Sequence, residues 1–234
     1  MEEDKKLEHL AIILDGNRRW AKEHGLNSSL GHKKGAEVLE NIVKYCNKIN
    51  MKYLTVYAFS TENWKRTEEE VGYLMILLQT YLDKLLKSLN MDNVKMEFIG
   101  NIEGLPEGLQ NRIHKIEEKT KNNTGLDFMM AFNYGGRDEI VRATKKIYQK
   151  VANGEINIED ITEQTITDNL YTAGKKDPDM VIRTSGELRT SNFLPWQITY
   201  SELFFMNKYW PDFTETDIDL CVEEFSKRHI RKGK

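Results

Sequence analysis

A short apolar run near the start of the chain ends in a dense group of polar side chains. Residues 11–14 read Ala-Ile-Ile-Leu, and Asp15-Gly16-Asn17-Arg18-Arg19-Trp20 follows at once. The aspartate suits a hard divalent cation, which takes oxygen ligands and often bridges to phosphate. Glycine lets the backbone approach a ligand closely, and two guanidinium groups offer forked donors that match phosphate oxygens. The segment therefore predicts a site for a metal ion and a phosphorylated substrate.

Three further polar groups accompany apolar runs later in the chain. They are Ser60-Thr61-Glu62-Asn63-Trp64-Lys65-Arg66, the segment Arg183–Ser191 with Arg189 and Thr190, and Glu202 within residues 196–205. In an open α/β sheet, ligands bind at the carboxyl ends of the strands, so these groups could meet at one edge. Arg183, Arg189 and Ser191 then predict a second anion site, separate from Arg18 and Arg19.

Two of the polar residues have more than one interpretation. Glu202 interrupts an otherwise apolar strand, where it could share metal coordination with Asp15 or simply face water. His32 opens a long helix, whose N-terminus attracts anions, but a surface or capping histidine is the plainer interpretation. Asp15 is harder to explain by structure alone, because a carboxylate directly after Ile-Ile-Leu is costly to bury without a partner.

The elements that must position these residues alternate between short β-branched or aromatic runs and amphipathic helical patterns. This alternation predicts a single α/β domain over residues 1–234, with a mostly parallel central sheet of about six strands flanked by helices. The expected strands are residues 10–14, 53–59, 95–99, 127–132, 180–183 and 201–205.

The longest helical pattern covers residues 67–89 and begins with capping-box spacing between Thr67 and Glu70. Its apolar stripe, which ends at Leu89, is wider than a single packing seam requires. The helix is therefore either deeply buried or lines an apolar channel for a ligand.

The composition excludes several classes of function. A formal net charge of −3 argues against general nucleic-acid binding, which usually needs a basic surface. The first residues are polar and lack the apolar core of a signal peptide, and no apolar run approaches the ~18 residues of a membrane span. We therefore expect a cytoplasmic protein in which any anion site is a local concentration of Arg and Lys.

Two anion sites, one metal and a long apolar channel fit two diphosphate substrates with hydrocarbon tails, and the matching reaction is prenyl transfer. Metal and arginine donors would stabilise the leaving diphosphate. The double bond of a second isoprenoid would attack the allylic carbon, and loss of one proton would complete the step. A phosphotransferase of the haloacid-dehalogenase kind also places Asp after an apolar strand, but it needs a second aspartate where Asn17 stands.

In these motifs the chain resembles the cis-prenyltransferase family, whose bacterial members include undecaprenyl diphosphate synthase. The resemblance extends from about His9 to about Arg228 and is carried by ordered blocks. They are Asp15–Trp20, Gly31-His32-Lys33, Tyr57–Trp64, Asn133-Tyr134-Gly135-Gly136-Arg137, Arg183–Glu187 and Trp210-Pro211-Asp212-Phe213. The resemblance implies a parallel sheet flanked by helices, an apolar tunnel beside the long helix, and a homodimer.

The activity that the resemblance implies is cis elongation of an allylic diphosphate, such as farnesyl diphosphate, with isopentenyl diphosphate. The product would be undecaprenyl diphosphate or a shorter homologue, used as a glycan carrier lipid. A wide apolar channel also implies peripheral contact with a membrane surface for product release. The alternative within the family is a non-catalytic partner subunit, but such subunits tend to lose the carboxylate and arginines that this chain keeps.

The resemblance also assigns roles to individual residues. The residue that matches Asp15 positions Mg²⁺ on the allylic diphosphate, Glu202 matches a second metal-contacting carboxylate, and Asn63 matches a catalytic position. Residues Gly16, Asn17, Arg18 and Arg19 are expected to hold the allylic diphosphate, His32 matches a histidine at the diphosphate site, and Arg183, Arg189 and Ser191 match the isopentenyl diphosphate site. The other expected substrate-binding residues, without assignment to one substrate, are Trp20, Ser28, Ser60, Thr61, Glu62, Trp64, Arg66 and Thr190.

Two positions depart from the usual bacterial pattern. Arg18 stands where many bacterial members have Gly, and Ser28 stands where the family usually has an arginine. Losing a charged phosphate contact would weaken binding by about 1.5–3 kcal/mol, so we hypothesise that Arg18 partly replaces the missing arginine. Phe132 has two interpretations, either as ordinary core or as a bulky side chain on a tunnel strand that shortens the product.

Overall fold

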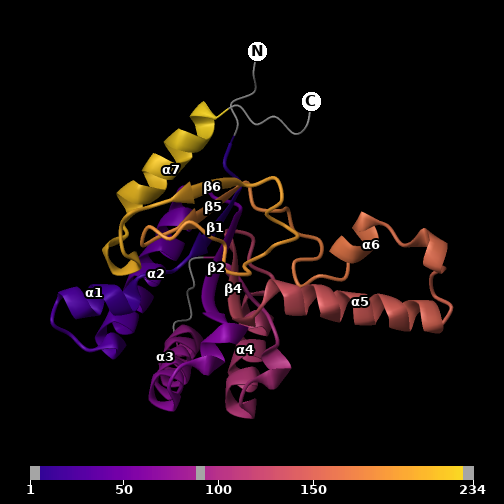
Figure 1. Ribbon diagram of the computed structural model, residues 1–234, viewed down its shortest axis with the longest axis horizontal. Coiled ribbons are helices and arrows are strands. Elements are labelled where there is room, and N and C mark those ends of the chain that lie inside the picture. The colour runs from indigo at the N-terminus through magenta and orange to yellow at the C-terminus, as the bar shows by residue number, and fades with distance from the viewer. Residues whose placement is uncertain (1–5, 88–92, 229–234) are drawn as a thin grey trace.

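A six-stranded sheet lies at the centre of the molecule (Figure 1), in a computed structural model that describes residues 6–87 and 93–228. The strands are β1 (His9–Ile13), β2 (Tyr53–Ser60), β3 (Lys95–Ile99), β4 (Asp127–Tyr134), β5 (Met180–Arg183) and β6 (Glu202–Phe205). The α-helices are α1 (Asn17–Glu23), α2 (Ser28–Lys48), α3 (Glu68–Lys87), α4 (Glu107–Thr120), α5 (Gly136–Ala152), α6 (Glu163–Thr167) and α7 (Glu215–Lys227). The short 3-10 helices are η1 (Thr61–Lys65), η2 (Ile102–Gly104), η3 (Ile158–Asp160) and η4 (Trp210–Asp212).

The strand pairings of the described residues are all parallel, in the order β3-β4-β2-β1-β5-β6. The predicted α/β fold and its six strands are confirmed, and β2 and β4 run one and two residues past their predicted ends. Ile13 of β1 pairs in register with Tyr57 of β2 and with Arg183 of β5. The polar segments that follow these three strands therefore emerge at the same edge of the sheet.

Different parts of the chain cover the two faces of the sheet. Helices α2, α3, α4 and α7 pack on one face, where Ile42, Leu82 and Ile113 are buried against apolar strand residues. The segment that follows β5 covers the other face and contributes Phe193 and Leu194. Helix α5 extends away from the sheet together with α6 (Figure 1). Packing on both faces fixes the strands and leaves the carboxyl edge free to carry a site.

Helix α3 is both packed against the sheet and part of a cavity wall, so both interpretations of the pattern at residues 67–89 hold. The backbone N–H of Glu70 donates to Thr67 Oγ1 (3.3 Å) in its first turn. Leu82 is buried against the sheet, whereas Leu74 lines a large cavity. Leu89, the expected end of the apolar stripe, lies outside the described residues. No helix in the part of the chain that the structure describes is long and apolar enough to cross a membrane.

Candidate active site

One large cavity, of about 1240 Å³, opens at the carboxyl edge of the sheet. Its polar end is lined by the segments that follow β1, β2 and β5, and its apolar end by α2, α3 and β4. The apolar lining includes Leu39, Leu74, Leu77, Tyr81 and Phe132. An apolar space joined to a few convergent polar groups suits a ligand with a charged head and a hydrocarbon tail. The structure thus contains the apolar space expected beside the long helix.

Asp15 forms the centre of the polar end. The Asp15 carboxylate accepts hydrogen bonds from Arg183 Nη2 (2.7 Å) and Arg19 Nη2 (3.2 Å). The Thr184 hydroxyl donates to the backbone carbonyl oxygen of Asp15 (2.6 Å). Burial by itself would raise the pKa of Asp15, but the hydrogen bond and charge of Arg183 and the charge of Arg19 outweigh it. The pKa therefore falls below 3.8, and Asp15 is ionised at neutral pH.

Close backbone packing explains the glycines on both sides of this site. Gly16 precedes α1 with φ +107°, and a Cβ there would lie 2.7 Å from the Tyr209 ring. A Cβ on Gly31 of α2 would lie 2.1 Å from the carbonyl oxygen of Asn17 on α1. Only glycine lets the two helices approach this closely. The approach brings His32, next to Gly31, to the wall of the cavity.

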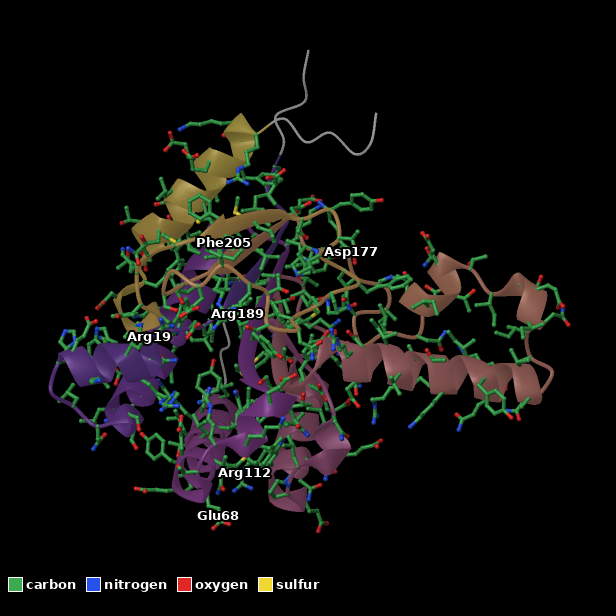
Figure 2. The ribbon with its side chains drawn as sticks, viewed as in Figure 1. Arg19, Glu68, Arg112, Asp177, Arg189 and Phe205 are labelled. Carbon is green, nitrogen blue, oxygen red and sulfur yellow. The ribbon has the colours of Figure 1, made fainter. Side chains whose placement is uncertain are left out.

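Arg19 connects Asp15 to a carboxylate that the sequence pattern did not single out. Arg19 Nη1 donates to Glu187 Oε1 (2.9 Å), and Arg19 Nη2 donates to Ser185 Oγ (2.6 Å). Glu187 also forms an ion pair with Arg189, so it links the two expected anion sites, whose arginines come from distant segments (Figure 2). The sequence signal that could have identified Glu187 as a site residue is its position in the Arg183–Glu187 block.

Arg183 spans the distance between Asp15 and the loop after β5. Its side chain is 5% exposed, and Nη1 donates to Ser191 Oγ (2.7 Å) and to the Arg189 carbonyl oxygen (2.5 Å). Arg183 and Ser191 line the cavity, but Arg189 and Thr190 do not, and the Arg189 side chain is 61% exposed. The structure therefore brings together part of the second anion site and leaves Arg189 outside the cavity.

The segment after β2 forms η1, which is held by its own side chains. Asn63 Oδ1 accepts from the Ser60 N–H (3.0 Å), and Trp64 Nε1 donates to Asn133 Oδ1 (2.7 Å). The side chains of this segment that line the cavity are Ser60, Glu62, Asn63 and Arg66. Thr61 and Trp64 do not line it, so their predicted contact with substrate has no counterpart in this arrangement.

Arg18, His32 and Arg66 gather on the side of the polar end nearest α3. Glu70, which the sequence marked only as a capping residue, lies among them. Burial, followed by the charge of Arg66, lowers the pKa of His32 from 6.5, although Glu70 opposes this shift. The imidazole is therefore mainly neutral at pH 7. Ser28 lines the same cavity as Arg18, so the two positions that depart from the usual bacterial pattern face the same cavity.

Glu202 and Trp20 lie away from the cavity. Glu202 begins β6 at the amino edge of the sheet, whereas Asp15 follows the carboxyl end of β1, and Glu202 pairs instead with Arg228 (2.5 Å). Within one chain, the expected metal site shared by Glu202 and Asp15 is therefore not formed. Trp20 Nε1 donates to Asp212 Oδ1 (2.7 Å). Among the described residues, no group of three His, Cys, Asp or Glu side chains could hold a metal ion.

Comparisons with known proteins agree with this geometry. The family model described as putative undecaprenyl diphosphate synthase matches residues 13–233. An isoprenyl transferase of Clostridium tetani is 49% identical over 96% of this chain and 88% of the relative. A ditrans,polycis-undecaprenyl-diphosphate synthase of Micrococcus luteus, described as specific for (2E,6E)-farnesyl diphosphate, is 45% identical over 96% of this chain and 90% of its own.

Two solved structures share the fold. Lavandulyl diphosphate synthase from Lavandula x intermedia, in complex with dimethylallyl diphosphate, matches with a TM-score of 0.93 and 36% identity, over 97% of this chain and 98% of that one. A probable undecaprenyl diphosphate synthase from Campylobacter jejuni matches with a TM-score of 0.81 and 32% identity, over 98% of this chain and 100% of that one. The chain therefore belongs to the undecaprenyl diphosphate synthase family of prenyltransferases.

Proposed function

We propose that this chain catalyses Mg²⁺-dependent cis-prenyl chain elongation, condensing isopentenyl diphosphate onto an allylic diphosphate such as farnesyl diphosphate. The observation that carries the proposal is one cavity that joins Asp15, Arg19 and Arg183 to an apolar space beside α3. Membership of a prenyltransferase family supports the same activity. The product would be undecaprenyl diphosphate or a shorter homologue that serves as a glycan carrier lipid.

Asp15 is the residue that would hold Mg²⁺. This ion is usually bound by one or two carboxylates together with substrate phosphates and waters, so it needs no dedicated cluster of protein ligands. Asp15 is ionised, and its partners Arg19 and Arg183 are cations that also bind phosphate, which fits an ion shared between the carboxylate and a diphosphate. When bound, the ion would neutralise charge that develops on the leaving diphosphate.

The side chains of the polar end would bind and orient the two substrates. Arg18, Arg19 and His32 would hold the allylic diphosphate, and Arg183 with Ser191 would hold isopentenyl diphosphate. As the allylic C–O bond breaks, its electron pair moves to the diphosphate, where the arginine donors stabilise the charge. The double bond of isopentenyl diphosphate forms the new C–C bond, and one proton leaves the condensed product.

We further propose that the protein is a homodimer that contacts a membrane surface peripherally when it releases its product. The family resemblance supports the proposed dimer. Leu26 lines the cavity, and both Leu26 and Leu30 are 41% exposed. Exposed apolar side chains beside the cavity would let an apolar product pass into lipid. Size-exclusion chromatography with light scattering tests the dimer, and co-sedimentation with lipid vesicles tests the membrane contact.

The activity is tested by incubating the purified chain with labelled isopentenyl diphosphate, Mg²⁺ and one allylic starter. Dimethylallyl, geranyl and farnesyl diphosphate serve as starters in parallel reactions, and mass spectrometry identifies the products. We expect a polyprenyl diphosphate with Mg²⁺ and none with EDTA. Absence of incorporation with every starter would contradict the proposal and would favour the non-catalytic partner subunit.

A further inference from the structure

The carboxylate of Glu70 lies between two arginines and a histidine on the α3 side of the cavity. Glu70 Oε1 accepts a hydrogen bond from Arg66 Nη1 (2.8 Å) and lies 3.4 Å from His32 Nε2. Glu70 Oε2 lies 3.6 Å from Arg18 Nη1. The Glu70 side chain is only 12% exposed, and all four residues line the cavity. A glutamate in the first turn of a helix ordinarily faces solvent and complements the helix dipole, but this one faces a binding cavity.

The contacts of Glu70 are those that a phosphate group would make. Guanidinium and imidazole N–H groups bind carboxylate and phosphate oxygens with the same charge-assisted geometry. A carboxylate and a diphosphate cannot both take the donors of Arg66 without strong repulsion, because two anions would lie only a few ångströms apart. A diphosphate that engages Arg66 and His32 must therefore displace Glu70.

We propose that Glu70 is an internal competitor for the diphosphate group of the allylic substrate, and that it thereby sets the affinity for this substrate. This rests on the proposed function, which brings an allylic diphosphate to Arg18 and His32. In the free protein, Glu70 partly neutralises the charges of Arg18 and Arg66 and keeps the side chains of Arg18, His32 and Arg66 in place. A diphosphate carries more negative charge than one carboxylate, so it takes over the N–H donors of the two arginines and of His32, and part of its binding free energy is spent on displacing Glu70.

Competition of this kind suits a reaction that repeats on one growing chain. Each condensation leaves inorganic diphosphate where the allylic head group was bound. That diphosphate must leave before the lengthened chain can bind there for the next step. A carboxylate that returns to Arg66 and His32 would speed this release.

The substitution Glu70→Gln tests the competition, because glutamine keeps the size and a hydrogen-bond acceptor for Arg66 but carries no charge. Glu68→Gln is the matched control, since Glu68 lies in the same first turn of α3 and is exposed (Figure 2). Each protein is titrated calorimetrically, with Mg²⁺ and without isopentenyl diphosphate, against farnesyl diphosphate and against inorganic diphosphate. We expect Glu70→Gln to bind both ligands roughly tenfold more tightly, the scale of one charge-assisted hydrogen bond, and Glu68→Gln to match wild type.

In turnover, Glu70→Gln should lower the KM for the allylic substrate and the inhibition constant of inorganic diphosphate, while the KM for isopentenyl diphosphate stays unchanged. Equal or weaker diphosphate binding by Glu70→Gln would overturn the proposal, and weaker binding would make Glu70 a positioning residue for Arg66 and His32. If wild type binds inorganic diphosphate but not farnesyl diphosphate, the choice of farnesyl diphosphate as the allylic substrate fails, while the competition is still measured with inorganic diphosphate. Binding of neither ligand would overturn both proposals.

Discussion

Substitution of Phe132 tests whether the wall of the cavity limits the length of the product. Its side chain is 4% exposed, stacks on Phe59 with ring centroids 5.0 Å apart, and lines the apolar end of the cavity. The residue is therefore both part of the core and part of the cavity wall. Phe132→Ala removes six ring carbons, which in a close-packed interior makes room for about one more five-carbon isoprene unit. We expect the product distribution to shift toward longer chains by at least that unit.

The same truncation also weakens the fold, so the assay must separate the two effects. Removing a buried phenylalanine ring costs about 3–5 kcal/mol, which lowers the melting temperature of a chain of this size by roughly 6–20 °C. Phe132→Leu removes fewer buried atoms and therefore costs less stability, so it gives a milder version of the change. Phe128→Leu is the matched control, because Phe128 is fully buried on the same strand but does not line the cavity.

Products of all variants are compared by mass spectrometry after equal incorporation of isopentenyl diphosphate, and stability is followed by circular dichroism. Longer products from Phe132→Ala and Phe132→Leu, with unchanged products from Phe128→Leu, would support the role of the ring as a boundary of the channel. Unchanged product length in Phe132→Ala, at a temperature where the variant is folded, would refute that role and leave Phe132 as core alone.

Two further predictions concern the polar end of the cavity. Arg18→Gly should raise the KM for the allylic substrate about threefold to tenfold, a modest effect because the Arg18 side chain is 61% exposed. Ser28→Arg, added to Arg18→Gly, should offset this rise in KM. An unchanged KM in Arg18→Gly would contradict the hypothesis that Arg18 compensates for Ser28. The folded-state pKa of Asp15 lies below 3.8, so its ionised carboxylate stabilises the protein above that pH and loses its contribution as pH falls through the folded-state pKa. Urea unfolding of wild type and Asp15→Asn should therefore show a constant difference between pH 5 and 7 that shrinks below about pH 4, and a difference that persists at lower pH would contradict this assignment.

Much of the fold is local enough to be predicted from the sequence. The six apolar runs became the six strands because short β-branched segments between amphipathic helices have few other ways to be buried. The order β3-β4-β2-β1-β5-β6 depends on pairings between distant segments, and the sequence pattern contains no signal for it. Helix α1 was also missed, because its seven residues, with Arg18 and Arg19, are too few to show an amphipathic period.

The candidate site was predictable where a polar residue directly follows a strand. Asp15 and Arg183 meet because β1 and β5 are parallel neighbours, whose ends coincide in register. Glu202 shows the opposite case, since it begins its strand and so lies at the other edge of the sheet. Glu70 and Glu187 were not predicted as site residues, because an acidic side chain near a helix start or in a polar loop is ordinarily a solvated group.

We propose that Asp15 organises the end of the cavity that binds two diphosphates for prenyl transfer. The most direct test compares Mg²⁺-dependent incorporation of labelled isopentenyl diphosphate by wild type and by Asp15→Ala, with circular dichroism to verify that both are folded. We expect ready incorporation by wild type and a loss of at least about a hundredfold in Asp15→Ala, the scale on which a group that stabilises transition-state charge contributes. Incorporation by a folded Asp15→Ala at close to the wild-type rate would contradict it.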